Sequence, residues 1–116
     1  MNYTLLIYQS PDDFAARADP IRHEAFYGSF LPYVQALRDA GVVVSSAGLQ
    51  APEAATTVHL RDGRRVQDGP YADTKEQLGG LFVIDVPDLD TALDWAARCP
   101  AGAGALVEVR PNLPGA

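Results

Sequence analysis

The chain has 116 residues, with nine Lys and Arg side chains against fifteen Asp and Glu, and its formal net charge is −6. A surface with this excess of acidic groups repels polyanions, so we expect no direct binding to nucleic acid. Hydrophobic residues make up 47% of the chain and charged residues 21%, which is typical of folded domains and excludes a disordered protein. We therefore expect residues 1–116 to form one domain.

One cysteine is present, which excludes an intrachain disulfide and a multi-cysteine metal site within one subunit. This cysteine content fits a reducing compartment. The apolar run at residues 3–8 is too short for a signal peptide or a membrane span, and no Lys or Arg precedes it. We expect a cytoplasmic protein with no membrane partner.

Residues 3–8 predict the first strand, and both of its alternating sets of side chains are largely apolar, so we expect it to be covered on both faces. A long helix is predicted at residues 20–40. Asp19 is its expected N-cap, Pro20 suits the first helical position, and Gly41 is its expected C-terminal cap.

One apolar stripe is predicted for this helix. We expect Pro32 to kink the helix or to mark its junction with an earlier short helix. At about 100° per residue, five side chains lie on the same face. These are His23, Phe26, Phe30, Val34 and Leu37.

A second strand opens at residues 42–44. Residues 56–61 and 64–67 predict a hairpin, because an Asp-Gly pair at Asp62 and Gly63 separates two runs of strand-forming residues.

Residues 68–80 predict a turn that leads into a single helical turn. Thr74 and Gln77 have the spacing of a capping box, and Gly79 is expected to end the helical turn in a left-handed conformation.

Residues 81–86 predict another strand. Asp88 is the expected N-cap of a second helix that Pro100 ends, and residues 106–110 predict the last strand. The inner stripe predicted for this helix is Leu89, Ala92, Leu93 and Ala96.

The predicted order is β-α-β, an inserted hairpin and a second β-α-β. This order predicts an α+β fold, a ferredoxin-like split βαβ with an inserted β-hairpin and both helices on one face of an antiparallel sheet. Because the first strand is apolar on both sides, we expect a second subunit to cover the other face, as a symmetric homodimer.

The segment at residues 68–80 is also the strongest candidate for a site. Its glycines and proline surround the charged residues Asp68, Asp73, Lys75 and Glu76, and loops held on a sheet are common binding sites. The alternative is that these residues only make turns, and both interpretations stay open.

The sequence DGPYADTKEQLGG at residues 68–80, followed by VIDVPD at 83–88 and ALVEVRP at 105–111, resembles the DGPF branch of the YCII-related family. The likeness extends from the first strand to Pro111. Tyr71 replaces the phenylalanine after which the branch is named, and Asp73 replaces the usual glutamate. The resemblance implies a ferredoxin-like dimer of the dimeric α+β barrel type.

The function of this family is mostly unassigned. Compact relatives have a His-Asp pair that is proposed as an acid-base dyad, and one relative is a dehydrochlorinase. Members of the DGPF branch are often encoded beside extracytoplasmic-function sigma factors or fused to them. The histidine of the compact relatives would fall near Phe30, so that dyad does not transfer to this chain.

His23 is a possible substitute, because an imidazole near Asp68 would act as a general base at neutral pH. We therefore name Asp68 and His23 as catalytic candidates. The alternative for His23 is a half-buried histidine satisfied by one hydrogen bond.

Further candidates are expected to bind the ligand. Arg110 is suited to grip a carboxylate or an enolate, with Glu108 beside it on the last strand, although a salt bridge at this position is an equal alternative. The candidate ligand-binding residues are Tyr71, Lys75, Glu76, Glu108 and Arg110.

The sequence therefore predicts a small cytoplasmic homodimer that binds an anionic or carbonyl-bearing metabolite beside residues 68–80. If it is an enzyme, we expect a lyase or isomerase that needs no cofactor and no metal. The alternative is a non-catalytic ligand sensor or accessory protein that acts with a sigma factor.

Overall fold

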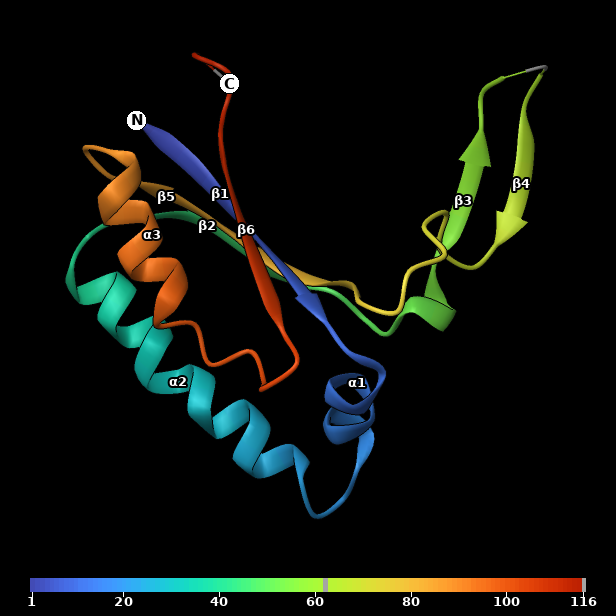
Figure 1. Cartoon of the computed structure of the whole chain (residues 1–116), viewed down its shortest axis with the longest axis horizontal. Coiled ribbons are helices and arrows are strands. Elements are labelled where there is room, and N and C mark those ends of the chain that lie inside the picture. Colours follow the sequence, from blue (N-terminus) through green and yellow to red (C-terminus); the bar gives the residue numbers. More distant parts are fainter. Residues whose placement is uncertain (62, 116) are drawn as a thin grey trace.

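The computed structural model describes residues 1–61 and 63–115. It contains a four-stranded antiparallel sheet in the order β2-β5-β1-β6, and a separate two-stranded hairpin, β3-β4 (Figure 1). This is the strand order of a ferredoxin-like α+β fold, so the predicted fold class is confirmed. The elements are β1 (Asn2–Gln9), α1 (Pro11–Ala18), α2 (His23–Asp39), β2 (Val43–Gly48), the short 3-10 helix η1 (Pro52–Ala54), β3 (Thr56–His59), β4 (Arg65–Asp68), β5 (Gln77–Asp85), α3 (Leu89–Ala97) and β6 (Leu106–Pro111).

The core lies between the helices and one face of the sheet. Side chains alternate along β1, and every second one is buried against the helices. Leu5 of β1, Leu37 of α2 and Ile84 of β5 are fully buried in this core. Apolar burial of this kind is the main force that holds α2 and α3 against the sheet.

The opposite face of the sheet is left open by the described helices. In β1 this face presents half-buried Thr4, Leu6 and Tyr8, and in β6 it presents Leu106, which is 61% exposed. Val107 and Val109 point the other way and pack against the core, as the alternation in the last strand predicts.

The first helical region differs from its prediction. The helix predicted at residues 20–40 is observed as α2, but an unpredicted helix, α1, precedes it, and the junction between the two lies before His23 instead of at Pro32, which α2 includes. The Asp19 side chain accepts hydrogen bonds from the backbone N–H groups of Ile21 and Arg22, which forms a tight turn. The predicted N-cap at Asp19 and helix start at Pro20 are therefore wrong, because α2 begins only after this turn, at His23. Gly41 follows α2 with a φ of 69°, as expected of a glycine that ends a helix.

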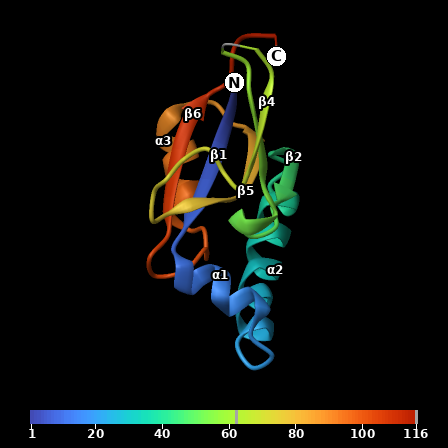
Figure 2. The same ribbon diagram turned by 90° about the vertical axis from the view of Figure 1, so that its right-hand side faces the viewer.

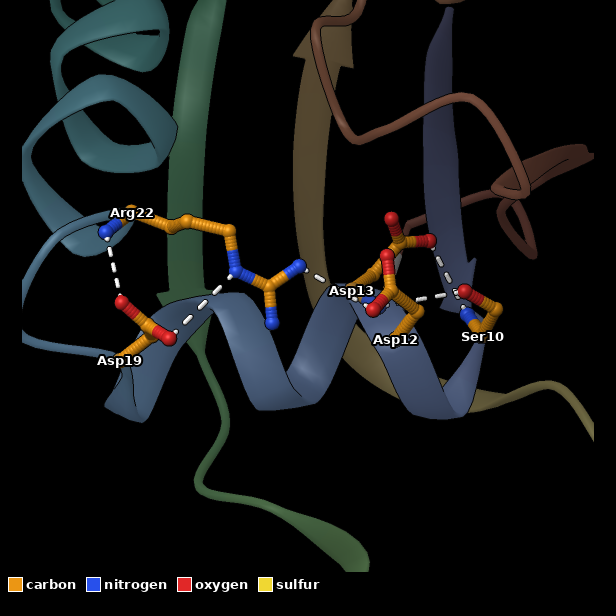
Figure 3. Close-up of polar contacts among 5 residues, drawn as sticks. All are labelled: Ser10, Asp12, Asp13, Asp19 and Arg22. Atoms are coloured by element: carbon orange, nitrogen blue, oxygen red, sulfur yellow. Dashed lines mark hydrogen bonds and ion pairs between the residues drawn. The ribbon is translucent and has the colours of Figure 1, made fainter.

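Helix α1 is fixed at both of its ends (Figure 3). Ser10 and Asp13 form a capping box, in which each side chain accepts a hydrogen bond from the backbone N–H of the other residue. Arg22, which follows the helix, forms ion pairs with Asp19 at the C-terminal end of α1, at 3.7 Å, and with Asp12 in its first turn, at 3.1 Å. The capping box therefore determines where α1 begins, and the exposed ion pairs join the helix to the segment that leads into α2.

The predicted hairpin is confirmed, with Val58 opposite Val66, and it projects away from the helices (Figure 1). Gly63 in its turn has a φ of 90°, while Asp62 lies outside the described residues.

The predicted helical turn within residues 68–80 is wrong. The Gln77 side chain donates to the carbonyl oxygens of Ala72 and Thr74, and this holds the segment as an irregular loop. Gly79 is not left-handed, because it belongs to strand β5.

Helix α3 begins where predicted, because Asp88 accepts a hydrogen bond from the Thr91 backbone N–H at 2.8 Å. Its predicted stripe is partly wrong, since Leu89 and Leu93 are 47% and 45% exposed. The helix is rotated so that Ala92 and Trp95 face the core, and the Trp95 carbonyl oxygen accepts a hydrogen bond from the Tyr33 hydroxyl at 2.7 Å. The small alanine and the large indole together determine this rotation.

Replacement of Leu37 by alanine is expected to lower the free energy of unfolding by about 3 kcal/mol, because it leaves a cavity in the core. The matched control is Leu31→Ala on the same helix, where the side chain is 72% exposed and we expect a change within about 0.5 kcal/mol. Urea denaturation followed by circular dichroism measures both. Equal losses in the two variants would contradict the described orientation of α2.

Candidate functional site

A cavity of about 690 Å³ opens between α1, α2 and the end of the sheet. From the side, α1 crosses the end of the sheet beside the first turns of α2 (Figure 2). The cavity walls are mostly apolar, with an aromatic wall made by Phe14 of α1 and by Phe26, Tyr27 and Phe30 of α2. The space therefore has the size and the lining of a small-molecule site.

Arg17 supplies the positive charge of the described cavity lining. Its guanidinium donates hydrogen bonds to the Gln9 side-chain oxygen, to the Leu49 carbonyl oxygen and, at 2.8 Å, to the Gly79 carbonyl oxygen. It also lies 4.8 Å from the ring centroid of Phe14 and 5.9 Å from that of Phe26, within the range of cation-π contacts. The guanidinium therefore lies between two aromatic rings and the backbone of the sheet.

The environment of Arg17 is poor in negative charge. No described Asp or Glu side chain forms an ion pair with it within 4.0 Å, and its Nε is buried with no hydrogen-bond acceptor among the described residues. Burial lowers the pKa of Arg17, and the nearby Tyr27 and Asp13 oppose this effect. An arginine nevertheless stays protonated at neutral pH. The described cavity wall therefore contains one positively charged side chain, Arg17, whose hydrogen-bond acceptors are all neutral.

Gln9 holds the guanidinium in place. It is 1% exposed, and its amide is used at both ends, since the oxygen accepts from Arg17 and the nitrogen donates to the Ala101 carbonyl oxygen at 2.9 Å. A buried amide that is satisfied in this way is rigid.

Two adjacent glycines make this arrangement possible. A Cβ at Gly79 would overlap the Gln9 side-chain oxygen and would lie 2.7 Å from the Arg17 guanidinium. A Cβ at Gly80 would lie 3.0 Å from the Ala47 carbonyl oxygen on the neighbouring strand. The Gly-Gly pair at the end of the 68–80 segment thus allows a close approach, where its sequence context predicts a turn.

The catalytic candidates do not meet in the structure. Asp68 is the last residue of β4, pairs with Thr56 across the hairpin and is exposed. His23 is the first residue of α2, and its Nδ1 lies 3.0 Å from the Asp19 carbonyl oxygen. Figure 1 shows the hairpin and the start of α2 well apart, and neither residue lines the cavity.

The ligand-binding candidates form two separate groups. Tyr71 is 76% exposed and packs against His59 of the hairpin, while Lys75 and Glu76 lie in the irregular loop before β5. A second group lies on the open face of the sheet, where Arg110 donates to Glu108 at 2.8 Å and thereby lowers the pKa of that carboxyl. None of these five side chains lines the cavity, and their predicted roles in binding stay predictions.

The sequence interpretation missed Arg17 and Gln9. Helix α1 has a single large apolar residue, Phe14, so it shows no apolar stripe. Its start was nevertheless readable, because Ser10 and Asp13 have capping-box spacing around a proline at the first helical position. That signal would have placed Phe14 and Arg17 on one helix, three residues apart and therefore on the same side.

Two further properties bear on the class of site. Within residues 1–61 and 63–115, no three His, Cys, Asp or Glu side chains are grouped closely enough to hold a metal ion. Across the same residues, no helix has both the length and the apolar character needed to span a membrane.

Comparison with known proteins identifies related sequences. The family model of the YCII-related domain matches residues 1–114. An uncharacterised protein of Rhizobium meliloti (strain 1021) is 46% identical over 59 residues, which cover 50% of this chain and 48% of that protein. The matched part is thus about half the length of this curated relative.

Replacement of Gly79 by alanine is expected to lower the free energy of unfolding by about 2 kcal/mol, because the new methyl group displaces Gln9 or Arg17. The control is Gly28→Ala on the exposed side of α2, where a Cβ meets nothing within 4 Å. We expect this control to match the wild type or to gain up to about 1 kcal/mol. Urea titration measures both, and wild-type stability of Gly79→Ala would refute the close approach.

Proposed function

The chain belongs to the YCII-related domain family, and we propose that this member binds a small organic molecule in the cavity between α1, α2 and the end of the sheet. The observation that carries the proposal is a mostly apolar cavity of about 690 Å³. Its wall contains the Arg17 guanidinium, which hydrogen bonds to Gln9 and Gly79 hold in place. Small-molecule sites commonly have volumes of about 300–1,000 Å³ and a few fixed polar groups in apolar walls.

The proposed site differs in position from the site that the sequence predicts. The sequence predicts a site beside residues 68–80, whereas the cavity includes only Gly79 and Gly80 of that segment. The polar groups in the described lining include Arg17, Gln9, Tyr27 and Ser46, with no carboxylate and no imidazole. This set favours binding over the proton abstraction that Asp68 and His23 were expected to perform.

A thermal-shift screen tests the proposal. The panel contains aromatic and aliphatic acids with their matched amides and alcohols, and a saturating compound at a hundred times its dissociation constant stabilises the protein by about 2.7 kcal/mol, a shift of several degrees. We expect at least one compound to raise the Tm of the wild type and of Asp68→Asn.

Two tryptophan variants locate the site. Ser46 lines the cavity from β2, so Ser46→Trp fills the space and is expected to abolish the shift. Ser29 lies on the exposed side of α2 outside the cavity, so Ser29→Trp is expected to keep it. A shift that survives in Ser46→Trp, or no shift with any compound, would exclude this cavity as the binding site. In the second case, capture of a sigma factor becomes the experiment for the accessory role.

We also propose that two copies associate through the open face of the sheet. This face combines half-buried Leu6, Leu81 and Val83 with exposed Leu106, beside the Arg110–Glu108 ion pair, and an exposed apolar patch on a sheet is usually covered by another surface. Family resemblance implies the same arrangement.

Light scattering on a sizing column is expected to report about twice the 12.4 kDa chain mass. Leu6→Glu places a charge at the centre of the face and is expected to give a folded monomer, whereas Leu31→Glu on exposed α2 is expected to stay dimeric. A monomeric wild type would rule out the facing-sheet dimer.

A further inference from the structure

We infer that the ligand of this cavity is an organic carboxylate with an apolar, ring-sized body, and that Arg17 binds its carboxylate. The inference rests on the proposed function, because it names the chemical class of the molecule that the cavity holds. It is carried by the contacts of the guanidinium, the charge balance around it and the shape of the remaining walls.

The first step is the charge balance. A guanidinium that is moved out of water is destabilised unless a charged partner compensates it. The hydrogen-bond acceptors of Arg17 are the oxygens of Gln9, Leu49 and Gly79, all of them neutral, and its Nε has no acceptor among the described residues. Asp13 acts on Arg17 only from beyond ion-pair distance, so a ligand carboxylate in the cavity would supply the negative charge in direct contact.

The second step is the rigidity of the cation. The Gln9 amide is itself fixed by the Ala101 carbonyl oxygen, and Gly79 has no Cβ that would press on the guanidinium. A cation that is held before the ligand arrives loses little conformational entropy on binding. Nη2 already donates to Gln9 and Gly79 and Nη1 to Leu49, so Nη1 keeps one N–H that can donate a charge-assisted hydrogen bond to a carboxylate oxygen.

The third step is the single charge. The described lining contains one cationic side chain, which matches a monoanion. A phosphate monoester carries up to two negative charges at neutral pH and is usually held by several donors or cations. The charge of the cavity therefore favours a carboxylate over a phosphate.

The fourth step is the body of the ligand. Phe14 and Phe26 flank the guanidinium, and Phe30 and Val34 continue the apolar wall along α2. Rings in such a wall pack well against another planar or branched apolar group. The combination selects a molecule with an acid at one end and an apolar body at the other.

The test compares acids with amides of the same shape. Benzoate, phenylacetate, 3-phenylpropionate and indole-3-acetate are titrated against the wild type by calorimetry, together with the four corresponding amides. We expect at least one acid to bind at least tenfold more tightly than its amide, because a charged hydrogen bond contributes more than a neutral one.

Variants assign the effect to Arg17. Arg17→Gln is expected to weaken acid binding about 10- to 100-fold and to leave amide binding within a factor of two. Arg17→Lys keeps the charge but loses the planar fork, so an intermediate affinity is expected. The matched control is Arg98→Gln, which removes an exposed arginine that lies over Trp95 on α3, and it is expected to bind acids like the wild type.

The outcomes separate the two proposals. If amides and acids bind the wild type equally, or if folded Arg17→Gln binds acids as tightly as the wild type, the carboxylate inference is overturned and the cavity remains a binding site. If neither set binds while neutral alcohols raise the Tm, the inference is likewise overturned. If no compound binds at all, both proposals fail. The wild-type comparison of acids and amides decides the ligand class even if Arg17→Gln does not fold.

Discussion

Arg17 and Gln9 lie against strand β5 because position 79 has no side chain. A methyl group there would occupy the place of the Gln9 oxygen and would press on the guanidinium, so the Arg17-Gln9 contact and a side chain at position 79 exclude each other. Together with the bonds from Arg17 to the Leu49 and Gly79 carbonyl oxygens, this contact ties the last turn of α1 to the end of the sheet. The cavity, its aromatic wall and its positive charge all depend on that placement.

The placement of α1 also has support from the other side of the molecule. Gly102 has a φ of 119°, and a Cβ there would lie 2.6 Å from the Asp13 carboxyl carbon, so the loop before β6 approaches the start of α1 very closely. The capping box of Ser10 and Asp13 and the Gln9 bond to Ala101 lie in the same region. Helix α1 is therefore confined between two glycine-containing segments, and a shift of either segment would move Arg17.

Much of the fold was predictable from periodicity and turn chemistry. The first strand, the alternation of β6, the Asp-Gly hairpin and the Asp88 cap are local signals, and each was confirmed, whereas cover on both faces of β1 stays a prediction. The errors arose where a local signal has two physical meanings. A glycine such as Gly79 serves either a left-handed turn or a close approach, and only the fold shows which.

The candidate site was less predictable, because its contacts join distant parts of the chain. Arg17 meets Gly79 across 62 residues and Gln9 meets Ala101 across 92, and no spacing rule reports such pairs. The orientation of α3 has the same origin, since Ala92 and Trp95 face the core and Trp95 packs against Tyr33, which lies 62 residues earlier in the chain. Periodicity locates the elements of a fold, whereas these long-range contacts determine where the elements meet.

The cavity is built without the hairpin. Its described lining comes from residues 7–51 and 79–82, and none of it comes from the connection between them, which includes η1, β3 and β4. Strands β2 and β5 are antiparallel neighbours, so a much shorter turn suffices to join them. A redesign that keeps residues 49–51 and replaces the hairpin by a shorter connection would therefore keep every described residue of the cavity lining.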